Sequence, residues 1–234
     1  MAGSAFSATY AEARAKFLEA AKSAGASLSA YEHPEPGPDG GKLATDVAWI
    51  GPADARGVLV LVSGTHGVEG HCGSGAQVDW LRRGEAARRA PDVAVMLVHA
   101  INPYGFAWSR RVTHENVDLN RNFIDFSAPL PANPAYDRLA DAVKPPTWTE
   151  ESRAQSRATL LAYARDHGFP ALIQAMSGGQ YSHPDGIFYG GQSETWSRRT
   201  LTAIFRERLS AAREVGIIDY HTGLGPEGYG EQIV

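Results

Sequence analysis

The feature that most constrains this 234-residue chain is the unbroken apolar run Gly57–Val62, which reads Gly-Val-Leu-Val-Leu-Val. Six such residues without polar alternation are typical of a strand that is buried on both faces of a sheet. Two more apolar runs of strand length follow, at residues 93–98 and 215–220. We therefore expect Gly57–Val62 to be a central strand of a multi-stranded sheet.

Helical patterns lie between the expected strands, near residues 73–83, 150–167 and 193–213, and residues 43–50 have the pattern of an edge-type strand. Strands that alternate with helices indicate an α/β fold. We expect a mixed, mostly parallel central sheet with helices on both faces. Ligands of such sheets bind beyond the carboxyl ends of the strands, so these ends are where chemistry is expected.

The remaining segments complete one expected domain, residues 1–234. Residues 1–30 are alanine-rich with interspersed charges, which predicts an amphipathic helix. Residues 32–42 are rich in proline and glycine and predict a loop. Residues 127–149 contain several prolines and are expected to form a long loop that could cover a site.

Composition excludes several classes of protein. The net charge is -4, with 43% hydrophobic and 21% charged residues, which is ordinary globular usage and gives no reason to expect a nucleic-acid partner. Cys72 is the single cysteine, so no internal disulfide can form, in keeping with a reducing cytoplasm. No apolar run approaches the ~20 residues needed to span a bilayer, and no secretory signal is visible. We expect a cytoplasmic protein without a membrane partner.

Possible metal ligands follow two of the expected strands. His66 and Glu69 lie in the turn after Gly57–Val62, and His221 follows the run at 215–220. Two histidines and one glutamate are the ligand set of a catalytic zinc ion with an open fourth position. A His-x-x-Glu pair alone is weak evidence, and His221 by itself would more readily be a core histidine. It is the three together, at strand ends of one sheet, that predict a metal site.

Further motifs lie between the first two candidate ligands and His221. Asp118-Leu-Asn120-Arg121 is preceded by Asn102-Pro-Tyr-Gly and by the pair Arg110-Arg111. With His66-Gly-Val-Glu69 before them and His221 after them, these motifs resemble the zinc carboxypeptidase (carboxypeptidase A-like) family of metallopeptidases. The resemblance includes its aspartoacylase and succinylglutamate desuccinylase branch, and it extends over residues 57–225.

The resemblance implies a role for each matching residue. His66, Glu69 and His221 would hold one Zn²⁺ ion, and Asn120 with Arg121 would bind a terminal carboxylate of the substrate. An arginine, Arg111 in preference to Arg110, would stabilise the oxyanion. Asp118 would accept the far N–H of the first zinc histidine. Three further residues have weaker assignments: Gln180 and Tyr181 as substrate contacts, and Asp219 as either a second carboxylate behind a ligand or a purely structural residue.

The chain departs from the family in one respect. The family's general base is a glutamate well downstream of the last zinc ligand, whereas only Glu227 and Glu231 follow His221 here, and neither has a matching context. Residues 230–234 resemble the beginning of a further strand. We therefore expect this sequence to lack the C-terminal part of a longer enzyme, although a natural short form that binds metal is the alternative.

The resemblance implies a zinc-dependent hydrolase that cleaves a peptide or amide bond next to a free carboxylate. Its substrate would be a small peptide or an acyl-amino acid. Three alternatives stay open: a deacylase of N-acyl amino acids, a metal-binding relative without activity, and an α/β domain whose histidines are structural. The sequence gives no indication of the oligomeric state.

Overall fold

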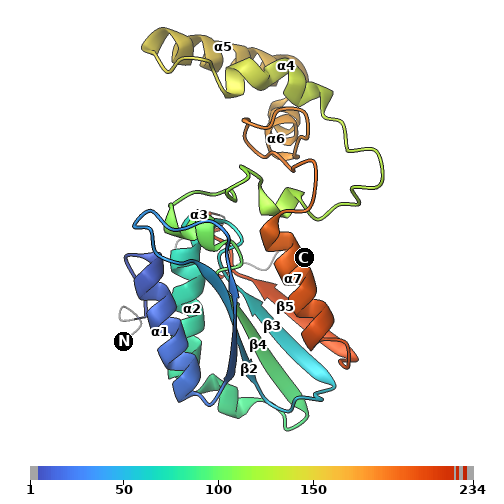
Figure 1. Ribbon diagram of the computed structural model, residues 1–234. Coiled ribbons are helices and arrows are strands. Elements are labelled where there is room, and N and C mark those ends of the chain that lie inside the picture. The colour runs from blue at the N-terminus through green and yellow to red at the C-terminus, as the bar shows by residue number, and fades with distance from the viewer. Residues whose placement is uncertain (1–4, 224, 227–228, 231–234) are drawn as a thin grey trace. The chain divides into compact units, whose positions relative to one another are not determined.

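The computed structural model describes residues 5–223, 225–226 and 229–230 (Figure 1). Contacts within the chain divide it into two compact units. Unit 1 comprises Met1–Arg111 and Thr200–Val234, and unit 2 is Val112–Arg199. The single domain expected from the sequence stays a prediction.

Unit 1 contains a five-stranded mixed sheet with the strand order β1-β2-β4-β3-β5. β1 pairs with β2 and β2 with β4 in antiparallel fashion, whereas β4–β3 and β3–β5 are parallel. The mixed α/β class expected from the sequence is confirmed, although the parallel pairings are confined to one side of the sheet. The strands are β1 (Ser27–Glu32), β2 (Ala44–Ile50), β3 (Gly57–Val62), β4 (Val93–His99) and β5 (Glu214–Asp219).

Helices cover both faces of this sheet (Figure 1). α1 (Tyr10–Ser23) and α2 (Gly70–Arg82) lie together on one face, and the C-terminal part of α7 (Trp196–Arg208) lies on the other. The short α3 (Pro103–Ala107) follows β4. Three 3₁₀ turns complete the elements of the first half of the chain, namely η2 (Gly67–Glu69), η3 (Glu85–Arg88) and, in unit 2, η4 (Leu119–Arg121).

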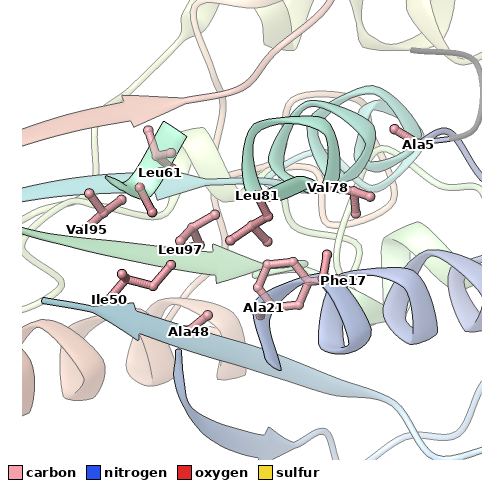
Figure 2. Packing of buried hydrophobic residues seen from close by; sticks show 12 residues of the cluster. Ala5, Phe17, Ala21, Ala48, Ile50, Leu61, Val78, Leu81, Val95 and Leu97 are labelled. Atoms are coloured by element: carbon pink, nitrogen blue, oxygen red, sulfur yellow. The ribbon is translucent and has the colours of Figure 1, made fainter. Parts of the chain in front are cut away.

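The core under α1 and α2 is built by alternate strand residues. Ala48, Leu61 and Leu97 belong to one buried cluster with Phe17 of α1 and Val78 of α2 (Figure 2). Because side chains alternate along a strand, the intervening residues of β2, β3 and β4 point to the opposite face, and most of these are buried too. This burial on both faces explains why the sequence of β3 is continuously apolar.

Two expectations about unit 1 need correction. Ser27–Glu32 forms β1, although the sequence to residue 30 was expected to be helical, because α1 already ends at Ser23 and Gly25 adopts φ 74°. β2 is not an edge strand, since β1 covers it and all its residues are buried. The strand expected at 215–220 is confirmed as β5, which lies at the edge of the sheet in the described part of the chain.

Unit 2 is mainly helical. It contains α4 (Pro134–Val143), α5 (Glu150–His167) and α6 (Phe169–Ser177), which share a small apolar cluster around Leu139 and Leu172. The presence of α4 corrects the expected long loop at 127–149. Asn133 caps α4 by accepting a hydrogen bond from the Tyr136 N–H, a signal that the prolines nearby obscured. No helix among the described residues is long and apolar enough to cross a membrane.

Candidate metal centre

The turn that carries His66 and Glu69 begins at the carboxyl end of β3 and is held on both sides. Gly64 adopts φ 72°, a conformation that glycine tolerates and other residues rarely adopt. Gly67 lies so close to α3 that a Cβ atom there would come within 1.9 Å of the Gly105 carbonyl carbon. On the other side, the buried Gln77 of α2 accepts a hydrogen bond from Ser63 and donates one to the Leu61 carbonyl. Packing therefore fixes the path of this turn.

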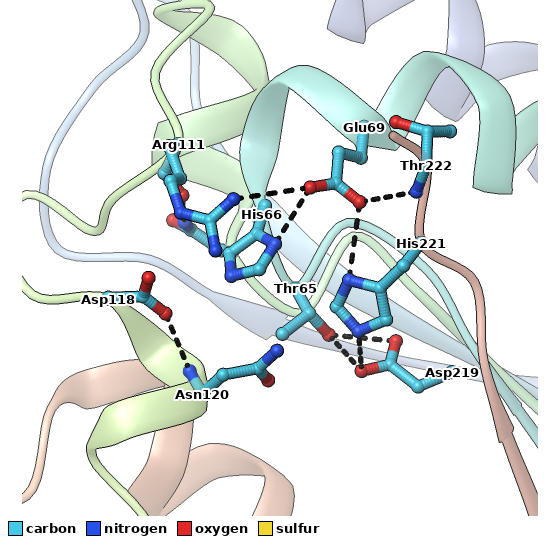
Figure 3. Close-up of polar contacts among 10 residues, drawn as sticks. Thr65, His66, Glu69, Arg111, Asp118, Asn120, Asp219, His221 and Thr222 are labelled. Atoms are coloured by element: carbon cyan, nitrogen blue, oxygen red, sulfur yellow. Dashed lines mark hydrogen bonds and ion pairs between the residues drawn. The ribbon is translucent and has the colours of Figure 1, made fainter. Parts of the chain in front are cut away.

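The first two candidate ligands meet within the turn. His66 directly precedes η2, Glu69 directly precedes α2, and their side chains are 4% and 11% exposed. The Nδ1 atom of His66 lies 2.8 Å from Oε1 of Glu69 (Figure 3). The short helical turn between the two residues places both side chains on the same side, as the three-residue spacing predicted.

The third candidate comes from the neighbouring strand. β5 runs parallel to β3, with Asp219 paired in register with Val62, so His221 emerges beside the turn that follows β3. Its Nδ1 atom lies 3.2 Å from Oε2 of Glu69, and the backbone N–H of Thr222 donates to the same oxygen at 2.7 Å. Its Nε2 atom lies 2.8 Å from Oδ2 of Asp219 (Figure 3).

These three residues form a donor set suited to a metal ion. One ligand atom from each of His66, Glu69 and His221 lies within 4.8 Å of the others, and no second such group occurs among the described residues. Both imidazoles turn Nδ1 toward the carboxylate of Glu69. Each Nδ1 can donate a proton to this carboxylate or, when it is deprotonated, turn its lone pair toward a cation that the carboxylate also binds. The arrangement is therefore compatible with metal binding.

The contacts within the cluster also shift the pKa values of Glu69 and His221. Burial raises the pKa of Glu69, but hydrogen bonds from His221, His66 and the Thr222 N–H outweigh it and hold that pKa well below its usual value. Hydrogen bonds to Asp219 and Glu69 raise the pKa of His221 to about 10 against the opposing effect of burial. In the metal-free protein, His221 therefore carries a positive charge beside the carboxylates of Glu69 and Asp219.

Arg111 is also brought to this cluster. Its Nη1 atom lies 3.6 Å from Oε1 of Glu69, and its side chain is 43% exposed (Figure 3). Its carbonyl oxygen accepts a hydrogen bond from the N–H of Gly67, which ties Arg111 to the ligand turn. Arg110 is held through its own backbone, by a bond from its N–H to the Gly105 carbonyl. Arg111 thus forms an ion pair with the cluster.

The Asp118-x-Asn120-Arg121 motif belongs to unit 2. Asp118 is fully buried and caps η4 by accepting a bond from the Asn120 N–H at 3.1 Å. Arg121 donates to the Ser177 carbonyl at 2.6 Å and lies over the ring of Phe188, whereas Asn120 is exposed. The motif thus forms a defined turn within its own unit, and the substrate-binding role of Asn120 and Arg121 stays a prediction.

The two weaker assignments in unit 2 have different outcomes. Gln180 is fully buried, and its amide bonds to the backbone of Ser182, His183 and Ile187, so it closes its own loop and has no group left for a substrate. Tyr181 is partly exposed and donates its hydroxyl to the Arg121 carbonyl at 2.6 Å, which supports the same turn. Its contact with substrate stays a prediction.

The sequence did not single out Thr65. Its hydroxyl lies 2.9 Å from both carboxylate oxygens of Asp219, and the residue is 4% exposed. Its position next to His66 is the only signal that could have pointed to it. Glu227 and Glu231, which the sequence left unassigned, lie outside the described residues, as does the apolar segment that ends the chain.

The family of the chain follows from its sequence. A family model described as "Protein of unknown function (DUF2817)" matches residues 6–234. The chain belongs to this family. The match includes the ligand turn, the Asp118–Arg121 motif and His221, so the candidate metal centre of this DUF2817 member lies within the family's own sequence. No protein with a curated description matches the chain.

Solved structures resemble the fold only distantly. A glutaminyl cyclase from Porphyromonas gingivalis is 11% identical, with a TM-score of 0.32 over 93% of this chain and 77% of that one. A Zn-dependent exopeptidase from Parabacteroides distasonis is 14% identical, with a TM-score of 0.31 over 94% and 83%. A glutaminyl cyclase from Macrostomum lignano is 12% identical, with a TM-score of 0.33 over 93% and 73%. Likenesses at this level assign no residue roles.

Proposed function

We propose that this DUF2817 member is a zinc-dependent hydrolase that cleaves a peptide or amide bond next to a free carboxylate. The observation that supports it is the convergence of two imidazole Nδ1 atoms and one carboxylate at the carboxyl ends of β3 and β5. Two histidines and one glutamate leave a fourth position open in a tetrahedral zinc site, which is the arrangement of catalytic rather than structural zinc.

The donor set favours zinc over hard cations. Magnesium and calcium are bound mainly by oxygen ligands, whereas two imidazoles and one carboxylate suit zinc and neighbouring transition metals. When bound, zinc supplies Lewis acidity to a scissile carbonyl and lowers the pKa of a water molecule. The protein's part includes keeping Glu69 ionised, which the hydrogen bonds to its carboxylate do.

Arg111 is the proposed stabiliser of the developing oxyanion. Its guanidinium lies beside Glu69 and is partly exposed, so a substrate at the open metal position would meet it. A positive charge that is fixed before the reaction stabilises the transition state because no reorganisation is needed as charge develops.

Asn120 and Arg121 are proposed to bind the substrate's free carboxylate. This assignment is supported by the resemblance of their motif to the zinc carboxypeptidases and by chemistry, since a guanidinium offers paired donors to a carboxylate and an amide adds a neutral donor. Asp118 is proposed, on the same resemblance, to orient His66. The substrate would be a small peptide or an N-acyl amino acid, because both carry an amide next to a free carboxylate.

Metal analysis is the first experiment. The purified protein is expected to hold one zinc ion per chain after incubation with zinc and dialysis, and His66→Ala and His221→Ala are expected to lose it. His71→Ala is the matched control, because His71 lies in the same segment but binds the Ser7 carbonyl instead of the cluster. A wild-type protein that takes up no zinc would contradict the proposal.

Hydrolysis then separates the two substrate classes. Zinc-loaded protein would be assayed with acyl-dipeptides, with N-acyl amino acids, and with the same compounds as C-terminal amides. Activity on free acids but not on amides is expected, and Arg121→Gln should raise KM for the free acids. Preference for N-acyl amino acids would identify a deacylase. Zinc binding without turnover of either class would identify a metal-binding relative.

A further inference from the structure

Behind His221 lie Asp219 and Thr65, to which the proposed function assigns no role. The imidazole of His221 has two ring nitrogens, and only Nδ1 faces Glu69 and the metal cluster. Nε2 points away from the cluster and meets Oδ2 of Asp219 at 2.8 Å, while the hydroxyl of Thr65 lies 2.9 Å from both oxygens of the same carboxylate (Figure 3).

Strand register brings this pair together. Asp219 ends β5 and pairs with Val62 of β3, and Thr65 follows in the turn that also carries His66. Alternate residues of an extended strand share a face, so Asp219 and His221 project to the same side. The contact between Thr65 and Asp219 thus joins the two segments that bear the candidate ligands.

We propose that Asp219 is the positioning residue for metal ligand His221, and that Thr65 anchors it. This inference rests on the proposed zinc site. A carboxylate that accepts the Nε2–H proton leaves Nδ1 as the only lone pair of the ring, and it also fixes the ring's rotation about its bond to Cβ. Carboxylates behind a metal-bound histidine orient the ring and increase its basicity.

Asp219 is distinguished from a direct ligand by its position. The cluster of mutually close ligand atoms contains His66, Glu69 and His221 and does not contain Asp219. Since Asp219 contacts the far nitrogen of the ring, the imidazole would stand between this carboxylate and a bound ion. The charge of Asp219 therefore acts through His221.

The buried hydroxyl of Thr65 gives this carboxylate a fixed partner. Thr65 is 4% exposed, whereas the side chain of Asp219 is 31% exposed. A hydroxyl has one proton and donates to one carboxylate oxygen at a time, so the other oxygen stays available for His221. Thr65 thus restricts a carboxylate that would otherwise rotate into solvent.

The test is zinc affinity, measured by competition with a chromophoric chelator. Asp219→Ala is expected to weaken zinc binding by about 10- to 100-fold, the range typical for loss of such a partner. Asp219→Asn should recover part of this loss, because an amide oxygen still accepts the Nε2–H bond but carries no charge. Thr65→Val, which keeps the shape of the side chain, should weaken binding least.

A matched control separates positioning from general damage. Asp79 on α2 is exposed to a similar degree as Asp219, at 34%, and pairs with Arg83. Asp79→Asn is expected to leave zinc affinity unchanged. A second readout is the ring of His221 in ¹⁵N-labelled protein with zinc, where the Nε2 proton should exchange with water slowly in the wild type and quickly in Asp219→Ala.

The outcomes distinguish this inference from the zinc site itself. Failure of the wild-type protein to bind zinc overturns both. Wild-type affinity in Asp219→Ala overturns the positioning role and leaves the zinc site standing. Loss as complete as in His221→Ala, with Asp219→Asn no better, would make Asp219 a ligand and also overturn the inference. If Asp219→Ala fails to fold, the zinc affinities of Asp219→Asn and Thr65→Val decide whether Asp219 positions His221.

Discussion

The two strands that carry the candidate ligands are hydrogen-bonded neighbours with opposite surroundings. β3 has most of its residues buried and is followed by a turn wedged against α3. β5 is exposed along its whole length, with Ile217 at 54% exposure. His66 and Glu69 are therefore fixed by packing, whereas His221 depends on polar contacts with Glu69 and Asp219. A metal ion at this cluster would therefore join β3 and its turn, the rigid half of the site, to β5 and His221, the weakly held half.

The largest expected effect tests the rigid half. Gly67→Ala places a Cβ atom 1.9 Å from the Gly105 carbonyl carbon and 2.2 Å from the Phe106 nitrogen, both of which are backbone atoms that cannot turn aside. We expect a loss of more than about 3 kcal/mol in the free energy of unfolding, measured by urea denaturation, because overpacking against backbone exceeds the usual range.

Gly216→Ala is the corresponding change in β5. Its Cβ atom would meet only Leu59 Cδ1 at 3.7 Å, an ordinary contact. Because alanine loses less conformational entropy than glycine on folding, we expect stability to stay constant or rise by up to about 1 kcal/mol. Equal destabilisation by the two glycine substitutions would show that the two strands do not differ as described.

Side-chain truncation gives the second test. Leu61 in β3 is 2% exposed and belongs to the core cluster with Val78 and Leu81 of α2. Leu61→Ala should cost about 2–5 kcal/mol because it removes buried methyl groups and leaves a cavity. Ile217→Ala in β5 should cost less than about 1 kcal/mol, since the side chain is half exposed. Thermal or urea unfolding of both variants measures the difference, and similar losses would contradict it.

The same contrast explains how much of the fold the sequence could predict. The apolar runs of β3 and β4 revealed buried strands because burial on both faces leaves a continuous pattern. β1 was missed because Ser27–Glu32 mixes polar and small residues, and its pairing with β2 is a long-range event. β2 was assigned to an edge for the same reason, since the strand that covers it was not recognised.

The sequence displays the candidate ligands of the site but not the residues that hold them in place. His66, Glu69 and His221 have chemistry and strand-end positions that the sequence displays. Thr65 contacts Asp219 across 154 positions of sequence, and only the parallel register of β3 and β5 makes that contact. Gln180 was misjudged because a buried amide that closes a loop looks the same in sequence as an amide that faces a substrate.

Zinc itself gives the third test. Free zinc at 100 times its dissociation constant should stabilise the protein by about 2.7 kcal/mol, because binding only the folded state shifts the unfolding equilibrium. Hydrogen–deuterium exchange should show slower exchange mainly in β5, Glu214–Asp219, while the amides of β3 change little. A chelator should reverse the effect, and His221→Ala should abolish it. Equal protection of both strands would show that β5 is not the weakly held half.

The smallest expected effect contrasts two histidines at strand ends. His221 follows β5, where partners raise its pKa to about 10, whereas His99 ends β4, fully buried against Phe17. Burial, assisted by the charge of Arg14, lowers the pKa of His99 to about 3 from an ordinary value of 6.5. The unfolded chain therefore binds more protons at this residue between those pH values, and its contribution to stability is present above pH 6.5 and lost as the pH falls.

At pH 5.5 the loss due to His99 should be about 1.4 kcal/mol relative to pH 7.5, one pH unit below the unfolded pKa. His99→Gln removes the titrating group while its amide can still bond to Ser74, the partner of Nε2. Urea unfolding of both proteins is measured at the two pH values with a chelator present. The contribution of His99 to the free energy of unfolding is the difference between the two pH dependences. The variant should lose about 1.4 kcal/mol less than the wild type on acidification. Parallel pH dependences would mean that His99 accepts a proton in the folded protein. The end of β4 would then be as accessible to protons as the end of β5.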